Sequence, residues 1–314
     1  MTLVIRVKFI IPDFAVNVRS GCAKLRPHTR GGRLTHEVFS FRRARARARA
    51  RGALRVQSAA KKFVVTTLRE RVRSGALTRG TFLNLGSPLA AEVCALSGFD
   101  WLLVDLEHGA GGEEALVGQL LAGATHGVSV LVRVESAERI RVGHALDLGA
   151  DGVMFPRLET PEEVSEAVTH LWYPPRGDRG VASYNRARQF GGDPRDAATV
   201  NDSLLGVVQI ESLRALQNVE RIAATPGVDV LFVGPGDLST ALGVPGQFDS
   251  PEFVTALDHV VEAARHANVV AGILTGDANR VDALNEQGFL FVAVGSDSAL
   301  LRAAARAASH VARS

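Results

Sequence analysis

The chain has 314 residues, of which 46% are hydrophobic, enough for one large domain with a substantial core. No apolar run approaches the roughly 20 residues that a membrane-spanning helix needs, so no membrane partner is expected. The net charge of +3 averages two unlike segments: residues 1–60 hold 14 basic and 2 acidic side chains, and the rest holds 22 basic and 31 acidic ones. Two cysteines, Cys22 and Cys94, argue against a disulfide scaffold and favour a reducing compartment.

The segment 1–62 contains "FRRARARARAR" and lacks the sustained periods that build a core, which predicts a disordered Arg-rich extension. Three interpretations stay open: a transit peptide processed near "RVQSAAKK", a start codon assigned too early, or a basic arm that binds nucleic acid. A transit peptide implies an organelle, and otherwise a cytoplasmic protein is expected. The acidic body of the chain argues against nucleic acid as a partner.

From residue 63 onward, short apolar runs alternate with helix-length segments, and each run is expected to form a strand. Helices are expected between the runs, for example over 87–98, 161–172 and 251–267, and the last two begin with proline. The eight expected strands are 81–86, 101–107, 129–135, 152–158, 206–211, 228–234, 269–274 and 289–295.

Strands that are apolar throughout and alternate with helices imply a parallel sheet covered on both faces. Eight such units predict an α/β fold, a single-domain (β/α)8 TIM barrel over residues 63–314. An open doubly wound sheet is the alternative, but no GxGxxG motif follows the first strand, which argues against a nicotinamide cofactor. The stretch 171–205 exceeds a plain connection, and we expect it to include a helix and to serve subunit contacts.

In such a barrel, side chains from several strands converge where the strands end. For any one polar residue at a strand end, the alternative is that it merely marks where the strand meets solvent. Polar residues appear together at several strand ends, and this favours an active site. His108 is the one histidine at such an end. The residues are Asp105, Glu107, His108, Arg133, Gln209, Glu211 and Asp237.

The positions of the lysines exclude one class of mechanism. All four, Lys8, Lys24, Lys61 and Lys62, precede the first expected strand. A Schiff base on a lysine amine therefore has no lysine inside the barrel, and pyridoxal phosphate chemistry fails for the same reason. If this barrel activates a carbonyl compound, we expect it to use a Lewis acid.

Glu211 and Asp237 are the candidate ligands for such an ion, because they follow adjacent strands and so lie side by side at the rim. Two carboxylates with water and substrate oxygens suit Mg²⁺ or Mn²⁺. The alternative is that Glu211 caps the helix after it and Asp237 caps the helix over "LSTALG".

Five stretches of the chain carry a resemblance to a known family: "FDWLLVDLEHG", "LVRVESAERIRVGHALDLGADGVMFPRLETPEEV", "YPPRGDRGVASYNRARQFG", "VVQIESLRALQNVERIAATPGVDVLFVGPGDLS" and "GILTGD…FLFVAVGSDSALL". Together they closely resemble the metal-dependent 2-oxo-acid aldolases, the group of 4-hydroxy-2-oxoheptanedioate and 2-dehydro-3-deoxyglucarate aldolases. The resemblance runs from about residue 66 to about residue 308 and does not cover residues 1–60.

The resemblance implies a role for each matching position. His108 is implied as general base and Arg133 as the group that stabilises the enolate. Asp105, at the same strand end as His108, is a further catalytic candidate. Glu211 and Asp237 are implied as ligands of Mg²⁺, Mn²⁺ or Co²⁺. The remaining positions are substrate contacts at Gln209, the Gly236 backbone and Asp237, and a residue that raises the basicity of the histidine, Asp147.

The resemblance also implies how these groups act on a 4-hydroxy-2-oxo acid. The ion lowers the cost of forming an enolate, and the histidine takes the proton of the C4 hydroxyl before the C3–C4 bond breaks. Asp147 precedes a strand, at the far barrel end of its own subunit, so it can reach a site only in a neighbouring subunit. A homo-oligomer, a trimer or hexamer as in the family, is therefore expected.

Two departures from the family limit what the resemblance implies. Leu106 separates Asp105 from Glu107 where some relatives have glycine or serine, and "GAGGEE" replaces another loop. Because these positions border the aldehyde pocket, the sequence does not determine which aldehyde the substrate releases.

Cleavage of an acyl-CoA thioester, as in malyl-CoA or citrate lyases, is the rival activity, although the rim lacks the clustered lysines suited to the CoA diphosphate. A nucleic-acid-binding protein that uses the Arg-rich segment is the rival outside enzymes.

Overall fold

The structure is a computed structural model that describes residues 66–311 of the chain. The extension predicted over residues 1–62 lies outside the described residues, so its disorder and the boundary at residue 63 stay predictions. Within the described part, no helix is long and apolar enough to cross a membrane.

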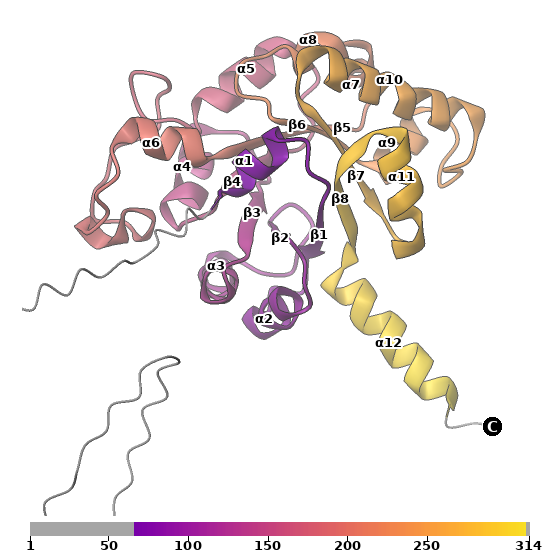
Figure 1. The fold of residues 1–314 in the computed structure, drawn as a ribbon, viewed down its shortest axis with the longest axis horizontal. Coiled ribbons are helices and arrows are strands. Elements are labelled where there is room, and N and C mark those ends of the chain that lie inside the picture. The colour runs from indigo at the N-terminus through magenta and orange to yellow at the C-terminus, as the bar shows by residue number, and fades with distance from the viewer. Residues whose placement is uncertain (1–65, 312–314) are drawn as a thin grey trace, which may run out of the picture. The chain divides into compact units, whose positions relative to one another are not determined.

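Eight parallel strands close into a barrel, in which each strand pairs with the next and the last pairs with the first (Figure 1). The predicted (β/α)8 TIM barrel is confirmed, and the alternative of an open sheet is wrong. The strands are β1 (Thr78–Leu83), β2 (Trp101–Asp105), β3 (Ser129–Arg133), β4 (Gly152–Phe155), β5 (Leu205–Ile210), β6 (Val230–Val233), β7 (Val270–Thr275) and β8 (Phe289–Ser296).

Helices connect the strands and lie around the barrel (Figure 1). They are α1 (Leu68–Arg73), α2 (Pro88–Leu96), α3 (Glu113–His126), α4 (Arg139–Asp147), α5 (Pro161–Thr169), α6 (Ala197–Ser203), α7 (Leu213–Gln217), α8 (Val219–Ala223), α9 (Pro235–Ala241), α10 (Pro251–Ala267), α11 (Val281–Gln287) and α12 (Asp297–Val311), with the 3-10 helices η1 (Arg186–Gly191) and η2 (Ala278–Arg280).

Local capping explains why the helices begin where the sequence predicts. Before α5, the Thr160 side chain accepts the Glu163 N–H and the Glu163 side chain bonds back to the Thr160 backbone. Before α10, the Ser250 side chain accepts the N–H of Phe253. The left-handed backbone of Asn268, with φ of 57°, ends α10.

Alternate residues of each strand point into the barrel and fill it with apolar side chains. The rings of Trp101 on β2 and Phe291 on β8 stack with their centroids 4.0 Å apart. Gly80 on β1 makes room for this pair, because a Cβ atom there would lie 2.1 Å from the Trp101 ring. The interior is therefore a packed core, and a site can lie only at one end of it.

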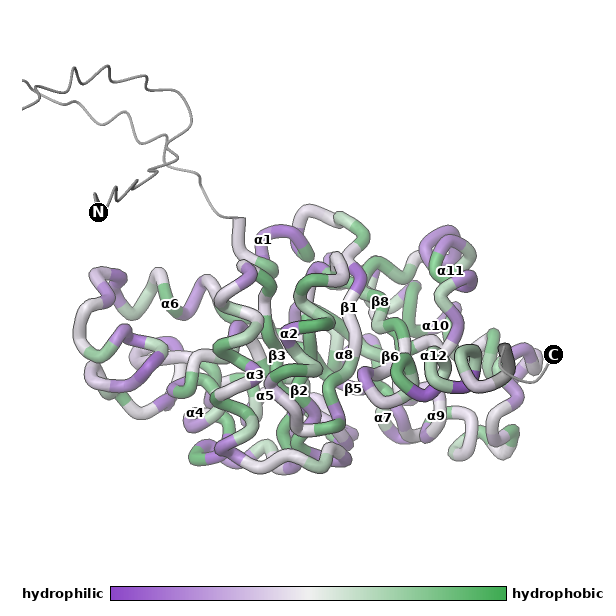
Figure 2. The backbone as a smooth tube through the Cα atoms, turned by 90° about the horizontal axis from the view of Figure 1, so that it is seen from below, coloured by the Kyte–Doolittle hydropathy of each residue, from purple (hydrophilic) through white to green (hydrophobic). Residues whose placement is uncertain are grey.

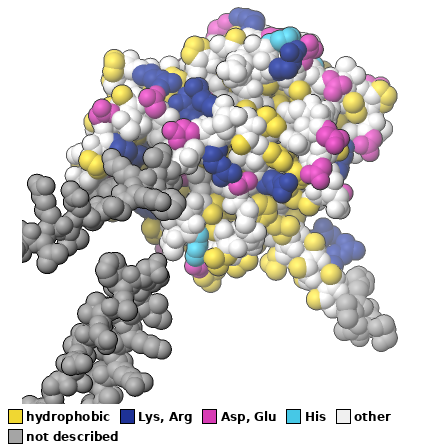
Figure 3. All heavy atoms as spheres, viewed as in Figure 1, with side chains coloured by type: hydrophobic (Ala, Val, Ile, Leu, Met, Phe, Trp, Pro, Cys, Tyr) yellow, Lys and Arg dark blue, Asp and Glu magenta, His cyan; other side chains and the backbone are white. Residues whose placement is uncertain are grey.

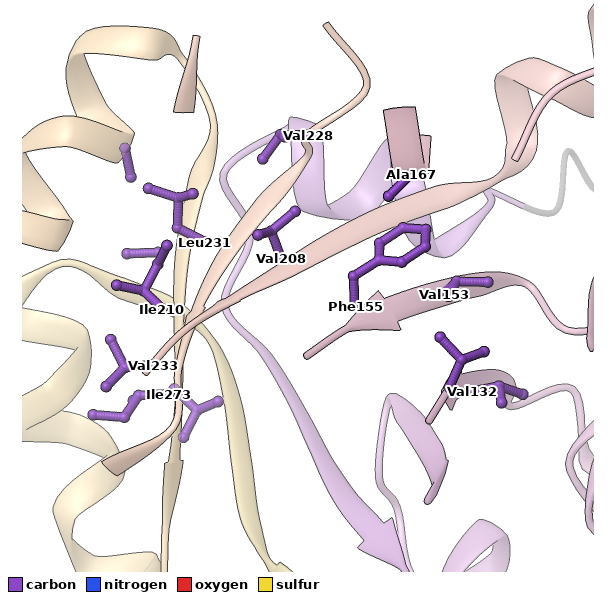
Figure 4. Packing of buried hydrophobic residues seen from close by; sticks show 14 of the residues in the cluster. Val132, Val153, Phe155, Ala167, Val208, Ile210, Val228, Leu231, Val233 and Ile273 are labelled. Carbon is purple, nitrogen blue, oxygen red and sulfur yellow. The ribbon is translucent and has the colours of Figure 1, made fainter. Parts of the chain in front are cut away.

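The other alternate residues point outward and pack against the helices. Figure 4 shows Val208, Ile210, Leu231 and Val233 among these buried side chains. The strands are therefore apolar on both faces, and in Figure 2 they run as hydrophobic segments beneath helices of mixed hydropathy.

Helix α1 covers the end of the barrel where the strands begin. Leu68 and Val72 join the interior cluster, and Arg69 Nε lies 3.0 Å from Asp229 Oδ2 in a buried ion pair just before β6. The carboxyl ends of the strands lie at the opposite end, where the sequence predicts the site.

Two predictions about connections and boundaries have different outcomes. The stretch 171–205 contains η1 and α6, so the predicted helix is confirmed, whereas its role in subunit contacts stays a prediction. The first strand was expected over 81–86 but spans Thr78–Leu83. Its first residues, "TRG", are not apolar and so do not signal a strand. Thr78 and Gly80 are small because they lie where the barrel interior is crowded.

Candidate active site

The alternation that fills the barrel also delivers polar side chains to the carboxyl ends of the strands. On β2, Trp101 and Leu103 point inward, and the next residue on that face is Asp105. On β3, Leu131 is followed in the same way by Arg133. Asp105 and Arg133 lie opposite each other in the pairing of the two strands. Barrel register therefore brings a carboxylate and a guanidinium together above the apolar core.

Strand β5 supplies two more polar side chains by the same periodicity. Its inward residues Leu205 and Val207 belong to the interior cluster. Gln209 continues this face, and Glu211 follows one residue beyond the strand. Both are buried, with 2% and 6% of their surface exposed, and the Gln209 Nε2 donates to Glu211 Oε2 at 3.0 Å.

Arg133 is the centre of a buried ion-pair network. Its Nε and Nη2 donate to the two carboxylate oxygens of Asp105 at 2.9 and 2.7 Å. Its Nη1 lies 3.1 Å from Glu107 Oε2 and donates to Gln209 Oε1 at 3.4 Å. The guanidinium lies 5.3 Å from the ring centroid of Phe82. This bidentate pairing fixes the orientation of a positive charge from which water is largely excluded.

Asp105 also fixes the loop that carries His108. Its Oδ1 accepts the backbone N–H groups of Glu107 at 3.1 Å and His108 at 3.2 Å. Gly109 follows, and a Cβ atom there would lie 2.1 Å from the Asp105 carbonyl oxygen, so only glycine fits. The imidazole itself is 68% exposed, with Nε2 3.8 Å from Glu107 Oε2. A rigid turn thus presents a free imidazole at the mouth of the barrel.

Glu211 is held by backbone contacts from two neighbouring strand ends. Its Oε1 accepts the Arg157 N–H at 2.9 Å, and Arg157 reaches this position with a φ of 57°. A Cβ atom at Gly234, after β6, would lie 2.7 Å from Glu211 Oε2. Burial raises the pKa of the Glu211 carboxyl, the Arg157 N–H opposes this rise, and the negative charge of Asp237 adds to it.

Asp237 lies in the first turn of α9 and is exposed to solvent. Gly234, not Asp237, is the N-cap residue of α9, and the Ser212 side chain, not Glu211, caps α7 by accepting the Ala215 N–H. The alternative in which the two carboxylates serve as helix caps is therefore wrong. Neither carboxylate is therefore accounted for by helix capping.

A cavity of about 430 Å³ lies over these groups, at the carboxyl ends of the strands. Glu211 lies next to this cavity, because it contacts two of the lining residues, Gln209 and Gly234. The lining residues come from seven strand ends and the segments that follow them: Phe82, Asn84, Asp105, His108, Arg133, Gln209, Phe232, Gly234, Pro235, Gly236, Asp237, Leu274, Thr275, Gly276, Gly295, Ser296 and Ala299.

The residues at this site fit a divalent cation bound by few protein ligands. The described residues contain no cluster of three or more histidine, cysteine or acidic side chains that could enclose an ion. Glu211 and Asp237 supply two carboxylates close enough for the charge of one to raise the pKa of the other. Mg²⁺ in particular retains waters and uses one or two carboxylates together with substrate oxygens. A cation here would relieve the repulsion between the two acids.

Asp147 is the one predicted site residue that the structure does not bring to the cavity. It ends α4, and its Oδ1 lies 2.6 Å from Arg179 Nη2. The Arg179 side chain is 1% exposed, so this ion pair is partly buried. This position agrees with the expectation that Asp147 does not reach the site of its own subunit.

The sequence does not predict what two residues of the site contact. Glu107 is expected at a strand end without a specific role, and in the structure it is the third partner of Arg133. Arg157 bonds to Glu211 through a left-handed backbone. Nothing in the sequence signals this conformation, which is uncommon for residues other than glycine.

Comparisons with known proteins agree with this geometry. The chain is 40% identical over 253 residues to a hydroxypyruvate/pyruvate aldolase of Paraburkholderia phytofirmans, covering 79% of this chain and 97% of that protein. It is 40% identical over 228 residues to a 5-keto-4-deoxy-D-glucarate aldolase of Klebsiella pneumoniae, covering 72% and 88%. A crystal structure of an HpcH/HpaI aldolase/citrate lyase family protein from Burkholderia cenocepacia superposes with a TM-score of 0.75 at 40% identity, covering 79% and 99%.

The family itself matches most of the barrel. Residues 78–304 match the family described as HpcH/HpaI aldolase/citrate lyase. The resemblance stated from the motifs is thereby confirmed. This chain belongs to the HpcH/HpaI aldolase/citrate lyase family and is a carbon–carbon lyase.

Proposed function

We propose that the protein reversibly cleaves 4-hydroxy-2-oxo acids into pyruvate, or a close 2-oxo acid, and an aldehyde, with the help of Mg²⁺, Mn²⁺ or Co²⁺. The observation that carries the proposal is the fixed guanidinium of Arg133, paired with Asp105 beneath an open cavity. The pair of carboxylates lies beside it and the imidazole of His108 lies at the mouth. The relatives named aldolases at 40% identity favour an aldehyde over an acyl-CoA thioester as the second product.

Each group has a distinct task in this reaction. A cation held by Glu211 and Asp237 would act as a Lewis acid toward the 2-oxo group. Gln209 and the Gly236 backbone contact the pyruvate half and orient it. Arg133 places its positive charge where the negative charge of the enolate grows, and its ion pairs keep it from reorienting as that charge develops.

His108 handles the proton of the reaction. In cleavage it takes the proton of the C4 hydroxyl through an intervening water, the C3–C4 bond breaks, and its electron pair passes into the enolate. The C4 fragment leaves as an aldehyde, and a proton added at C3 completes pyruvate. The exposure of the imidazole lets it exchange that proton with solvent between turnovers.

Metal removal tests the proposal directly. Pyruvate release from 4-hydroxy-2-oxo acids should vanish in EDTA and return when Mg²⁺, Mn²⁺ or Co²⁺ is added. The cation should also raise the unfolding temperature, because it binds the folded chain alone. The Glu211→Gln variant should lose this thermal shift, whereas Glu159→Gln, a surface change, should keep it. Cleavage that continues in EDTA would contradict the proposed chemistry.

We also propose that the protein acts as a homo-oligomer, a trimer or hexamer. Helix α2 exposes three apolar side chains along one side, Leu89, Val93 and Leu96, with 74%, 65% and 67% of their surface exposed. Helix α12 extends away from the barrel in Figure 1, and Leu301 on it is 62% exposed. Apolar patches of this kind on a surface favour a protein partner. A second copy would also bring Asp147 to a neighbouring site.

Sedimentation analysis of the oligomer tests this proposal. The parent protein should sediment as a trimer or hexamer. Val93→Asp should shift it toward the monomer, because an unpaired charge would enter the apolar contact. Val254→Asp, at a half-exposed position on α10, is the matched control and should leave the mass unchanged. A parent protein that sediments as a monomer would rule out a partner's Asp147 in the site.

Nucleic acid is not part of the proposal. On the face seen in Figure 3, acidic and basic side chains are interspersed. That face lacks the continuous basic stripe that a phosphate backbone requires. The Arg-rich segment lies outside the described residues.

A further inference from the structure

A second cavity, which we call the recess, adjoins the candidate active site. Its volume is about 450 Å³, within the range of small-molecule sites of roughly 300–1,000 Å³. The two cavities adjoin along the strand ends of β6 and β7, where they share the lining residues Pro235, Gly236, Leu274, Thr275 and Gly276. The recess therefore lies directly beside the place where the substrate is expected to react.

The recess has apolar walls. They are built between the outer face of β7 and the helices α10 and α11, together with the loop before α10. The rings of Phe248 and Phe253 lie with their centroids 5.5 Å apart and form one side. The apolar side chains of the lining are Phe248, Phe253, Leu257, Ile273 and Leu284.

The charged residues of the recess already have partners in the protein. Asp277 Oδ1 accepts both the backbone N–H and the side-chain amide of Asn279, each at 2.9 Å. Arg280 Nη2 donates to Asp249 Oδ1 at 3.2 Å. The Thr275 hydroxyl bonds to the Asp277 backbone. Because these groups are paired, the recess suits an uncharged hydrocarbon group better than an ionic one.

Two glycines, Gly236 and Gly276, lie at the boundary that the two cavities share. A Cβ atom built on Gly236 or Gly276 would meet no atom within 4 Å. Open space therefore lies beside the backbone at both positions. Because neither glycine carries a side chain, we expect a narrow alkyl chain to cross the boundary there more easily than a branched one.

We propose that the recess binds the hydrocarbon chain of the aldehyde half of the substrate. This inference rests on the proposed function and names its substrate class: 4-hydroxy-2-oxo acids that carry an unbranched alkyl chain beyond C4. The paired carboxylates and Arg133 hold the pyruvate half, and the alkyl chain passes Gly276 into the recess. Specificity for the aldehyde then comes from apolar burial in a place separate from the bond-breaking groups.

A chain-length series tests the inference. Pyruvate release is measured with Mg²⁺ present from 4-hydroxy-2-oxopentanoate, -hexanoate, -heptanoate and -octanoate. We expect kcat/KM to rise about fourfold for each added methylene, the effect of burying one such group. The rise should end where the chain reaches the wall of the recess at Leu284.

Two variants change the recess in opposite directions. Leu284→Phe fills its inner end and should lower the ratio of kcat/KM for the octanoate to that for the pentanoate by about 15-fold, the loss of two methylenes of burial. Phe248→Ala enlarges its outer part and should move the preferred chain to greater length, a gain that misfolding cannot produce. Leu121→Phe, the same substitution on the half-exposed side of α3, should leave the chain preference as in the parent.

The outcomes separate the inference from the proposed function. Pyruvate released at equal kcat/KM across the series would overturn the inference and leave the aldolase function standing. The same holds if the parent prefers long chains but neither recess variant changes that preference. No pyruvate from any member of the series would overturn the inference, and no pyruvate from 4-hydroxy-2-oxo acids with polar chains as well would overturn both.

Discussion

Replacing Arg133 by alanine should reduce kcat/KM for pyruvate release by at least 10²–10³-fold and also weaken the fold. The loss of activity follows from removing the fixed positive charge at the enolate. The loss of stability follows because Asp105 and Glu107 would keep buried charges without their partner. Removing one member of such a buried pair costs about 3–5 kcal/mol. Urea unfolding and steady-state kinetics at saturating Mg²⁺ measure the two effects.

Two further variants show whether geometry or charge alone matters at this position. Arg133→Lys keeps the charge but cannot bond both oxygens of Asp105, so it should recover only part of the stability and activity. Arg221→Ala removes an exposed arginine that lies 2.8 Å from Glu162, and it should change stability by about 1 kcal/mol or less. Wild-type activity in Arg133→Ala would show that the guanidinium has no catalytic role.

Replacing His108 by alanine should lower kcat by about 10²–10⁴-fold and leave the unfolding temperature nearly unchanged. The imidazole is 68% exposed and lies 3.8 Å from Glu107, so the fold loses little packing with it. The turn itself is held by backbone N–H groups that the substitution keeps. Kinetics and thermal unfolding of the same preparation give both values.

A matched histidine provides the control for this variant. His259 is also part-exposed, and it lies 2.7 Å from Glu220 on the outside of the barrel. His259→Ala should leave kcat as in the parent. If His108→Ala unfolds the protein, the histidine has a structural role, and if it turns over at the parental rate, another group takes the proton.

The sequence by itself determined the elements of this fold and the identity of the polar residues at their ends. Apolar runs separated by capped helices predict eight strands, and the prediction holds because each signal is local. Thr160 with Glu163 and Ser250 with Pro251 cap their helices through contacts within a few residues. The predicted bounds of the first strand were wrong because the need for glycine at Gly80 comes from its contact with Trp101, a residue of another strand.

Tertiary structure alone decided how those polar residues meet. Closing the barrel fixes which alternate residues face inward, and this register aligns Asp105 with Arg133 and places Gln209 beside Glu211. The left-handed backbone of Arg157 depends on such non-local contacts as well. The recess depends on non-local contacts too, because its walls come from the outer face of β7 and from α10 and α11. Local pattern specifies an element, but a site is a set of distances between elements, and only the closed barrel sets those distances.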